Sequence, residues 1–223
     1  MDHNKIWKIY DDKLNSFFKK SFEFNKDLSS YWGYDFIFRE IFNWEHSETG
    51  CIYEMWDCVL KPNDIVVDIG SNVGFFSVKA SKLASKVISI DGSPEVYSCL
   101  VENCKDYPNI FTLNSSVLPE DSEQSWPWSV KGNPLRMTLE DVMELFQLDR
   151  IDFLKCDIEG GEYDLFDSVF PETLSKIDRI AIETHHEDKN ETFYIPGKVR
   201  HSFFWEYPGG RQTMLYFISP KKD

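Results

Sequence analysis

The chain has 223 residues, of which 42% are hydrophobic, so it is long enough to form one domain with a full core. Its 38 acidic and 24 basic residues give a formal net charge of −14, a field that repels polyanions, so we expect no nucleic-acid partner. Five cysteines without a C-x-x-C pair argue against a zinc site and a disulfide framework. The sequence has no signal-like apolar run and none long enough to span a bilayer, so we expect a cytoplasmic protein with no membrane partner.

The first 46 residues are rich in Phe, Tyr and Trp but show no clear period. We interpret residues 1–46 as an aromatic-rich N-terminal extension packed on the core, and residues 47–223 as the main domain. The composition changes near residue 48, where short β-rich runs begin to alternate with helical patterns. This alternation is typical of βαβ units and a parallel sheet.

The predicted elements follow this alternation in chain order. Hydrophobic spacing predicts helices at residues 51–60, 75–83, 95–104, 139–146 and 162–169. It predicts strands at residues 65–69, 87–90, 110–113, 151–156 and 180–182. Two further β-rich runs, 202–207 and 212–218, flank Pro208-Gly209-Gly210 and predict an antiparallel hairpin. The fold class is therefore α/β and Rossmann-like, with a mostly parallel sheet and an antiparallel C-terminal hairpin.

The strongest motif is the turn that follows the strand at 65–69. It contains Asp68, Gly70, Ser71, Asn72 and Gly74, and leads from an apolar strand into a helix. A glycine here permits a tight turn and a close approach of a ligand to the backbone. The spacing Gly-x-x-x-Gly differs from the Gly-x-Gly-x-x-Gly of dinucleotide sites, and a carboxylate at Asp68 would repel a pyrophosphate. Asp68 suits a ligand with an ammonium and a sulfonium group, and S-adenosyl-L-methionine carries both.

Asp91 follows the second strand, about 20 residues beyond the glycine turn, where an acid can reach the hydroxyls of a ribose. Any single Asp after a strand is more often a turn or cap residue. The combination of Asp91 with the glycine turn favours a nucleoside ligand at the carboxyl ends of the strands.

Three blocks together resemble the FkbM-type methyltransferase family. They are residues 60–74, with a Lys-Pro turn and Asp-x-Gly-x-Asn-x-Gly; residues 136–142; and residues 151–162, similar to Lys-x-Asp-x-Glu-Gly-x-Glu. The resemblance covers about residues 51–182 and implies a class I methyltransferase fold. It also implies O-methylation of a hydroxyl on a sugar or other small metabolite.

The resemblance assigns roles to individual positions. The cofactor-binding residues it implies are Asp68, Gly70, Ser71, Asn72, Gly74, Asp91, and, near the adenine, Ser115 and Ser116. Asp157 and Glu159 would face the transferred methyl group or the acceptor. Asp91 departs from the family pattern because Gly92-Ser93 separates it from Pro94.

A hydroxyl acceptor needs a general base or a metal. The candidates at the ends of the fourth and fifth strands are Asp157, Glu159, Glu183, His185 and His186. We assign Asp157, Glu159 and His185 as catalytic. No metal is assigned, although Asp157, Glu159, Glu183 and His185 together could hold one.

Several alternatives remain open from the sequence. Glu159 and Glu162 could simply favour the start of a helix. Trp126-Pro127-Trp128 could be an aromatic platform for the acceptor or a pinned loop. The chain could also be an NAD-dependent oxidoreductase, or an inactive cofactor-binding protein of the same fold. The sequence leaves the oligomeric state and the identity of the acceptor unknown.

Overall fold

The computed structural model describes residues 37, 40–42, 45–120, 122, 135–185, 192–207 and 210–220. Several predicted features lie outside the described residues: most of the extension at 1–46, the loop Trp126-Pro127-Trp128, His186 and Pro208-Gly209.

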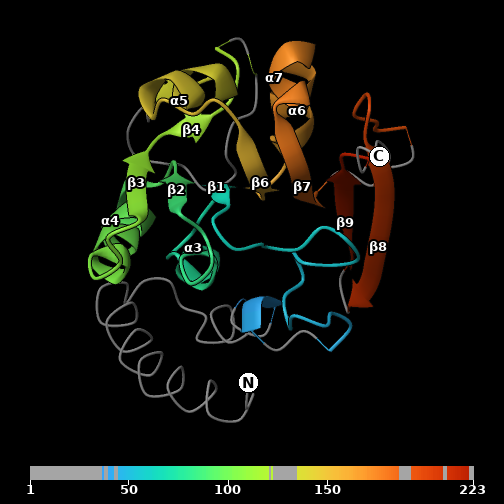
Figure 1. The fold of residues 1–223 in the computed structure, drawn as a ribbon, viewed down its shortest axis with the longest axis horizontal. Helices are drawn as coiled ribbons and strands as arrows, with labels where there is room; N and C mark the ends of the chain where they lie inside the picture. Colours follow the sequence, from blue (N-terminus) through green and yellow to red (C-terminus); the bar gives the residue numbers. More distant parts are fainter. Residues whose placement is uncertain are drawn as a thin grey trace.

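One seven-stranded sheet forms the centre of the molecule, in the order β3-β2-β1-β6-β7-β9-β8 (Figure 1). Its five parallel strands are β1 (Ile65–Ile69), β2 (Lys86–Asp91), β3 (Ile110–Asn114), β6 (Ile151–Cys156) and β7 (Ile177–Thr184). The hairpin β8 (Val199–Tyr207) and β9 (Gly210–Ile218) is antiparallel within itself, and β9 is antiparallel to β7. The order places β1, β2, β6 and β7 beside one another, so their carboxyl ends meet at one edge.

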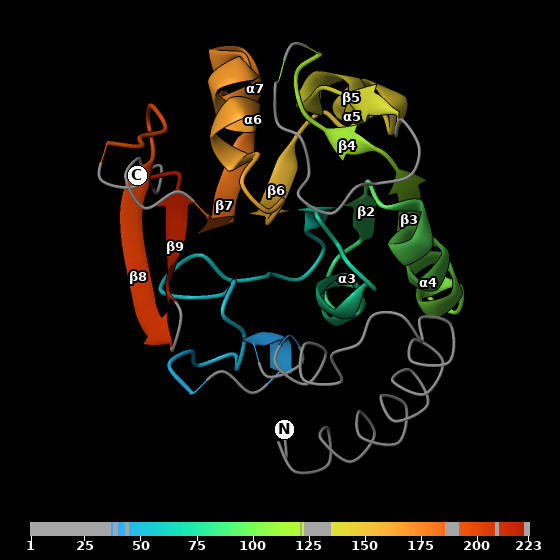
Figure 2. The ribbon, with the colours of Figure 1, turned by 180° about the vertical axis from the view of Figure 1, so that it is seen from behind.

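Both faces of the sheet are covered, because the central strands are apolar on both sides. On one face Val67, Ile69 and Leu154 belong to a cluster with α5 (Leu139–Leu145), α6 (Glu162–Ser168) and α7 (Pro171–Ser175). On the other face Val66 and Phe153 belong to a cluster with α3 (Phe75–Ala80) and the segment 51–60. Figures 1 and 2 show these two layers from opposite sides, and α4 (Pro94–Cys104) lies near the β3 edge.

The helix predicted at residues 51–60 is wrong, because this segment forms turns. Met55 and Cys58 form an isolated bridge around Trp56, whose φ of 52° breaks helical geometry. Glu54 is buried, accepts a hydrogen bond from the amide of Leu60 at 2.9 Å and pairs with Lys79. The apolar residues of this segment therefore fill a buried loop and not one stripe of a helix.

Three further elements were not predicted. They are the short helix α7 and the strands β4 (Ser116–Val117) and β5 (Arg136–Met137), which pair in parallel outside the main sheet. β7, β8 and β9 extend beyond their predicted ranges, whereas the helix predicted at 75–83 ends at Ala80. α5 begins at its predicted cap, Thr138, which forms a capping box with Asp141.

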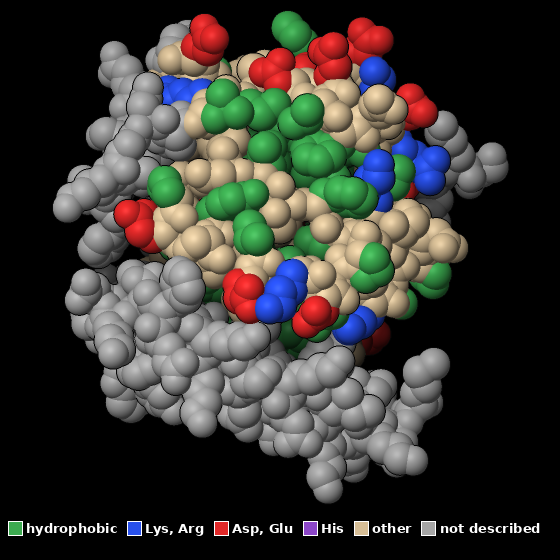
Figure 3. Space-filling view, turned by 90° about the vertical axis from the view of Figure 1, so that its left-hand side faces the viewer, with side chains coloured by type: hydrophobic (Ala, Val, Ile, Leu, Met, Phe, Trp, Pro, Cys, Tyr) green, Lys and Arg blue, Asp and Glu red, His purple; other side chains and the backbone are tan. Residues whose placement is uncertain are grey.

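Figure 3 shows the face at the β3 edge of the molecule, where apolar side chains gather in the middle and charged ones lie around them. Phe111, on the edge strand β3, is 43% exposed. The described residues include no helix long and apolar enough to cross a membrane. All five cysteines are free thiols and are buried.

Candidate active site

The glycine turn after β1 lies against the end of β6. Gly70 has a φ of 73°, and a Cβ at this position would lie 1.7 Å from the backbone oxygen of Asp157. The amide of Asp157 in turn donates to the carbonyl of Ile69 at 3.1 Å. Gly74, with a φ of 97°, precedes α3 and lies against Leu100 of α4. The backbone of the turn therefore lies directly against the backbone at the end of β6. Only glycine, which has no Cβ, permits this contact at position 70.

Asp68 is fully buried under this turn. Its Oδ2 accepts a hydrogen bond from the Ser77 hydroxyl at 2.6 Å, and its Oδ1 lies 3.3 Å from the Nζ of Lys155. Lys155 also donates to the carbonyl of Gly70 at 2.5 Å. These contacts hold the glycine turn in place. Oδ1 of Asp68 makes no hydrogen bond to the described residues, so the ligand contact expected from the sequence stays a prediction.

The charge of Lys155 is stabilised by its carboxylate neighbours. Burial acts to lower the pKa of Lys155, but Asp68, Asp157 and Glu183 together raise it above the ordinary value. Burial also raises the pKa of Asp68, while Lys155 and Ser77 act in the opposite direction. This cation ties β1 to β6 beneath the site.

Asp91 ends β2 and faces the glycine turn. Its Oδ2 accepts from the amide of Asn72 at 3.0 Å, and its Oδ1 accepts from the amide of Ser93 at 2.9 Å. Burial raises the pKa of Asp91 to about 6, while the bonds from Ser93 and Asn72 lower it. Each carboxylate oxygen keeps one lone pair, so this half-buried side chain can still accept from two ligand hydroxyls.

The predicted serines differ in what they can offer a ligand. Ser71 donates to the carbonyls of Asp68 and Ile90, and Ser115 donates to backbone carbonyls including that of Leu135, so both hydroxyl protons are used within the fold. Ser116 is 5% exposed, and its Oγ has no hydrogen-bond partner among the described residues.

Gly92, which departs from the family pattern, lies directly against this free hydroxyl. A Cβ at Gly92 would lie 2.7 Å from the Oγ of Ser116. The insertion of Gly92 and Ser93 therefore lets the turn after β2 approach β4, while the side chain of Ser93 caps α4.

Asp157 lies at the centre of a hydrogen-bonded group of acids. The Tyr53 hydroxyl lies 2.8 Å from Asp157 Oδ2 and 2.9 Å from Glu183 Oε2. Tyr53 has only one proton, so the second bond needs a proton from a carboxyl group. Burial, with the charges of Asp157 and Glu40, raises the pKa of Glu183 well above its usual range, which makes Glu183 the neutral donor.

His185 follows β7 and joins Glu159 and Glu162. Its Nδ1 lies 3.0 Å from Oε1 of Glu162, and its Nε2 lies 3.4 Å from Oε2 of Glu159 and 3.9 Å from Oε1 of Glu183. Burial acts to lower the pKa of His185, but Glu162, Asp157 and Glu183 raise it to about 10. The unliganded imidazole is therefore protonated at neutral pH and carries no free lone pair.

The predicted catalytic residues come together in space. One ligand atom each of Asp157, Glu159 and His185 lie within 4.8 Å of one another. Glu162, which the sequence placed at a helix start, also accepts from the amides of Ile158 and Gly160, each at 3.1 Å. It therefore fixes both the loop that carries the acids and the imidazole.

Three residues of this site were missed from the sequence: Glu40, Tyr53 and Lys155. Glu40 is 5% exposed, and its pKa is raised to about 8 by burial and by the charge of Asp157. Tyr53 lies in the segment taken for a helix, and Lys155 stands within an apolar strand. A lysine between Leu154 and Cys156 is the one signal that could have been followed, because a buried cation needs a partner.

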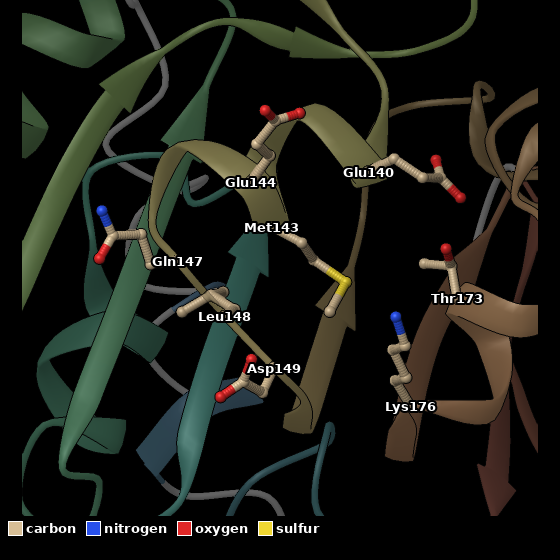
Figure 4. Close-up of a pocket in the computed structure, with 8 residues that line it drawn as sticks. All are labelled: Glu140, Met143, Glu144, Gln147, Leu148, Asp149, Thr173 and Lys176. Atoms are coloured by element: carbon tan, nitrogen blue, oxygen red, sulfur yellow. The ribbon is translucent and has the colours of Figure 1, made fainter.

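A separate hollow of about 350 Å³ lies at the opposite ends of the strands (Figure 4). Its lining residues are Glu140, Met143, Glu144, Gln147, Leu148, Asp149, Thr173 and Lys176. Leu148 and Asp149 precede β6, and Lys176 precedes β7, so the hollow is separated from the Asp157 group by the length of these strands. It holds none of the predicted site residues.

Comparison with known proteins gives one family match and several partial relatives. A model described as "Methyltransferase FkbM domain" matches residues 68–207. "Methyltransferase sdnD" of Sordaria araneosa is 24% identical over 67% of this chain and 74% of its own. A "Ribosomal RNA small subunit methyltransferase A" of Dehalococcoides mccartyi is 31% identical over 33% of this chain, and the match spans only 27% of that relative's length.

Among solved structures, M. capricolum TrmK in complex with S-adenosyl-homocysteine superposes with a TM-score of 0.50 at 11% identity. The superposition covers 73% of this chain and 65% of that one. At this identity the likeness concerns the fold alone.

Proposed function

The chain belongs to the FkbM family of methyltransferases, and from this premise we propose that it methylates a hydroxyl group of a sugar or another small metabolite. The family and the fold class predicted from the sequence are confirmed. S-adenosylmethionine is the cofactor, as expected, and the solved neighbour of the same fold holds the product of that cofactor.

The expectation that nucleic acid is excluded as a partner is wrong. One relative is named a ribosomal RNA methyltransferase, so a domain of this kind also serves RNA substrates. The prediction was wrong because it used the net charge of the whole chain. A net charge of −14 does not describe the electrostatic potential at one face of the molecule. RNA therefore belongs among the acceptors to be tested.

The residues around the glycine turn fit the expected cofactor. The turn leaves no room for a side chain at Gly70, Asp91 keeps acceptor lone pairs for ribose hydroxyls, and the buried hydroxyl of Ser116 lacks a partner. We assign Asp91, Asn72 and Ser116 to direct contact. Asp68 and Ser71 hold the turn in place.

The observation that carries the proposal is the meeting of Asp157, Glu159 and His185 beside the glycine turn. When bound, the cofactor supplies a methyl group on a positively charged sulfur that needs no further activation. The protein must then position the acceptor and remove its proton. A hydroxyl needs its proton removed to become a good nucleophile, whereas a neutral amine attacks through its lone pair. A group of carboxylates at this place therefore favours an oxygen acceptor.

Asp157 and Glu159 have different roles because their surroundings differ. Asp157 accepts the hydroxyl proton through Oδ1, because Oδ2 already contacts Tyr53 and Lys155. Glu159 is 57% exposed and guides the acceptor from the rim of the site. Protonated His185 limits the repulsion between these acids.

The test has two stages. Calorimetry should show S-adenosylhomocysteine binding and no NADH binding, since a dinucleotide site is the alternative. Transfer of a labelled methyl group is then measured on sugars, other hydroxylated metabolites, and ribosomal and transfer RNA. Labelling of a small hydroxylated acceptor supports the proposal. Labelling of RNA alone refutes the acceptor class, and binding without transfer to any acceptor would favour the inactive cofactor-binding protein.

A further inference from the structure

The group at the ends of β6 and β7 offers the ligand types of a metal site. Asp157 and Glu159 supply carboxylate oxygens and His185 supplies Nε2, and these atoms lie within 4.8 Å of one another. We propose that these three residues bind one divalent metal ion of the Mn²⁺ or Zn²⁺ type. Two carboxylates and one imidazole form a mixed oxygen and nitrogen set, which such ions accept, whereas Mg²⁺ and Ca²⁺ prefer oxygen alone.

The hydrogen bonds of His185 support this assignment. Metal-binding histidines almost always donate their other ring N–H to a carboxylate, a backbone carbonyl or a water, which fixes the orientation of the ring. Glu162 Oε1 lies 3.0 Å from Nδ1 of His185 and is 1% exposed. The same oxygen accepts from the amides of Ile158 and Gly160, so Glu162 ties the imidazole to the loop that carries Asp157 and Glu159.

Unsatisfied buried oxygens provide an independent argument. The Oε2 of Glu162 and the Oε1 of Glu40 are buried and have no hydrogen-bond partner among the described residues. Both belong to side chains that are more than nine-tenths buried, and both flank the group: Glu162 contacts His185, and Glu40 interacts electrostatically with Asp157. A buried polar atom without a partner indicates a missing water or ion, and the carboxylates gathered at this place favour a cation.

The existing cations leave the metal position free. Lys155 is 3.3 Å from Asp68 but 3.7 Å from Asp157, and it contacts only Oδ2 of Asp157. Oδ1 of Asp157 makes no hydrogen bond to the described residues. A metal ion bound at Nε2 takes the place of the proton that His185 carries in the unliganded site, because only a neutral imidazole donates a lone pair.

A metal ion at this site would take part in the proposed methyl transfer, so its catalytic role rests on the proposed function. Three protein ligands leave coordination positions open, as in catalytic metal sites. A metal ion can lower the pKa of a bound water to about 7, and an acceptor hydroxyl at an open position would be acidified in the same sense. With Asp157 bound to the ion and no longer acting as the base, the proton of that hydroxyl would pass to solvent before the oxygen accepts the methyl group.

Metal binding can be tested without any acceptor. Chelator-treated full-length protein is titrated with Mn²⁺ and with Zn²⁺, and binding is followed by calorimetry and, for Mn²⁺, by electron paramagnetic resonance. We expect one ion per chain. Glu159→Gln, which changes an exposed side chain, and His185→Ala should each weaken binding by more than about 100-fold, since loss of an outer-shell partner alone costs about 10- to 100-fold.

Glu144→Gln is the matched control, because Glu144 is an exposed carboxylate of α5 remote from the group. It should bind the metal as the unchanged protein does. Glu162→Gln tests the positioning role and should weaken binding by about 10- to 100-fold, with thermal unfolding measured to confirm that the variant folds. The site would be overturned if neither ion binds. It would also be overturned if the Glu159 and His185 variants bind the metal as tightly as the unchanged protein does.

The two proposals fail in different ways. If methyl transfer proceeds fully in excess chelator and neither ion binds, the metal site is refuted while the methyltransferase stands. If Mn²⁺ or Zn²⁺ binds at these residues but no acceptor is methylated, the metal site stands and the proposed function fails.

Discussion

Replacement of Gly70 by Ala gives a sharp test of the site, because the chain contains a matched control. Gly70 and Gly197 have nearly equal φ values of 73° and 76°. A Cβ at Gly70 would lie 1.7 Å from the backbone oxygen of Asp157, whereas nothing lies within 4 Å of a Cβ at Gly197. Both substitutions therefore place an alanine in the same left-handed conformation. Only Gly70→Ala also places a Cβ against the backbone of Asp157.

The expected magnitudes follow from these two differences. A left-handed conformation costs an alanine about 1–2 kcal/mol, so Gly197→Ala should lower the melting temperature by several degrees and leave cofactor binding unchanged. In Gly70→Ala the turn must move by more than about 1 Å from Asp157 to reach an ordinary contact distance. A misplacement of about 1 Å can cost about 100-fold in rate, and we expect a loss of that order in S-adenosylhomocysteine affinity.

The assay is calorimetric titration of both variants with S-adenosylhomocysteine, together with thermal unfolding. Equal affinity of Gly70→Ala and Gly197→Ala would mean that the contact between the turn and Asp157 has no part in cofactor binding.

Three further predictions concern other parts of the molecule. Asp91→Asn should keep the fold but weaken S-adenosylhomocysteine binding about tenfold, since one of its two ribose-facing acceptors becomes a donor; unchanged affinity would remove Asp91 from the site. His185→Ala should bind the cofactor product as before and slow methyl transfer by about 100-fold or more, because Asp157 and Glu159 lose the cation that limits their repulsion; unchanged turnover would contradict this role. Arg179→Met should destabilise the fold by about 3–5 kcal/mol in a denaturant titration, because Arg179 is buried and forms two hydrogen bonds to Asp64, at 2.8 and 3.1 Å; a loss below about 1 kcal/mol would show that the pair contributes little.

The parts of the fold that the sequence predicted are those set by local patterns. The strand at 65–69, the glycine turn and the capped helix after Thr138 each depend on residues close together in the chain. The segment 51–60 was predicted wrongly because its apolar spacing suits a helix, while its actual shape is set by burial against β9 and α3. Tyr216 of β9, for example, donates its hydroxyl proton to the carbonyl of Ile52.

The site was predicted in part for the same reason. Asp157, Glu159 and His185 lie at strand ends, and the order of strands in a parallel sheet brings such ends together. Tyr53 contacts Asp157 across 104 positions of sequence, and no local pattern predicts such a contact. The sequence also did not predict that Lys155, on the neighbouring strand, would form an ion pair with Asp68.

The most direct test of the central claim is a crystal structure of the protein with S-adenosylhomocysteine. We expect the ribose hydroxyls to bond to Asp91, the adenine to lie beside Ser116, and the sulfur to face Asp157. A ligand bound instead in the hollow between α5 and α7, or one whose ribose lies away from Asp91, would contradict this expectation.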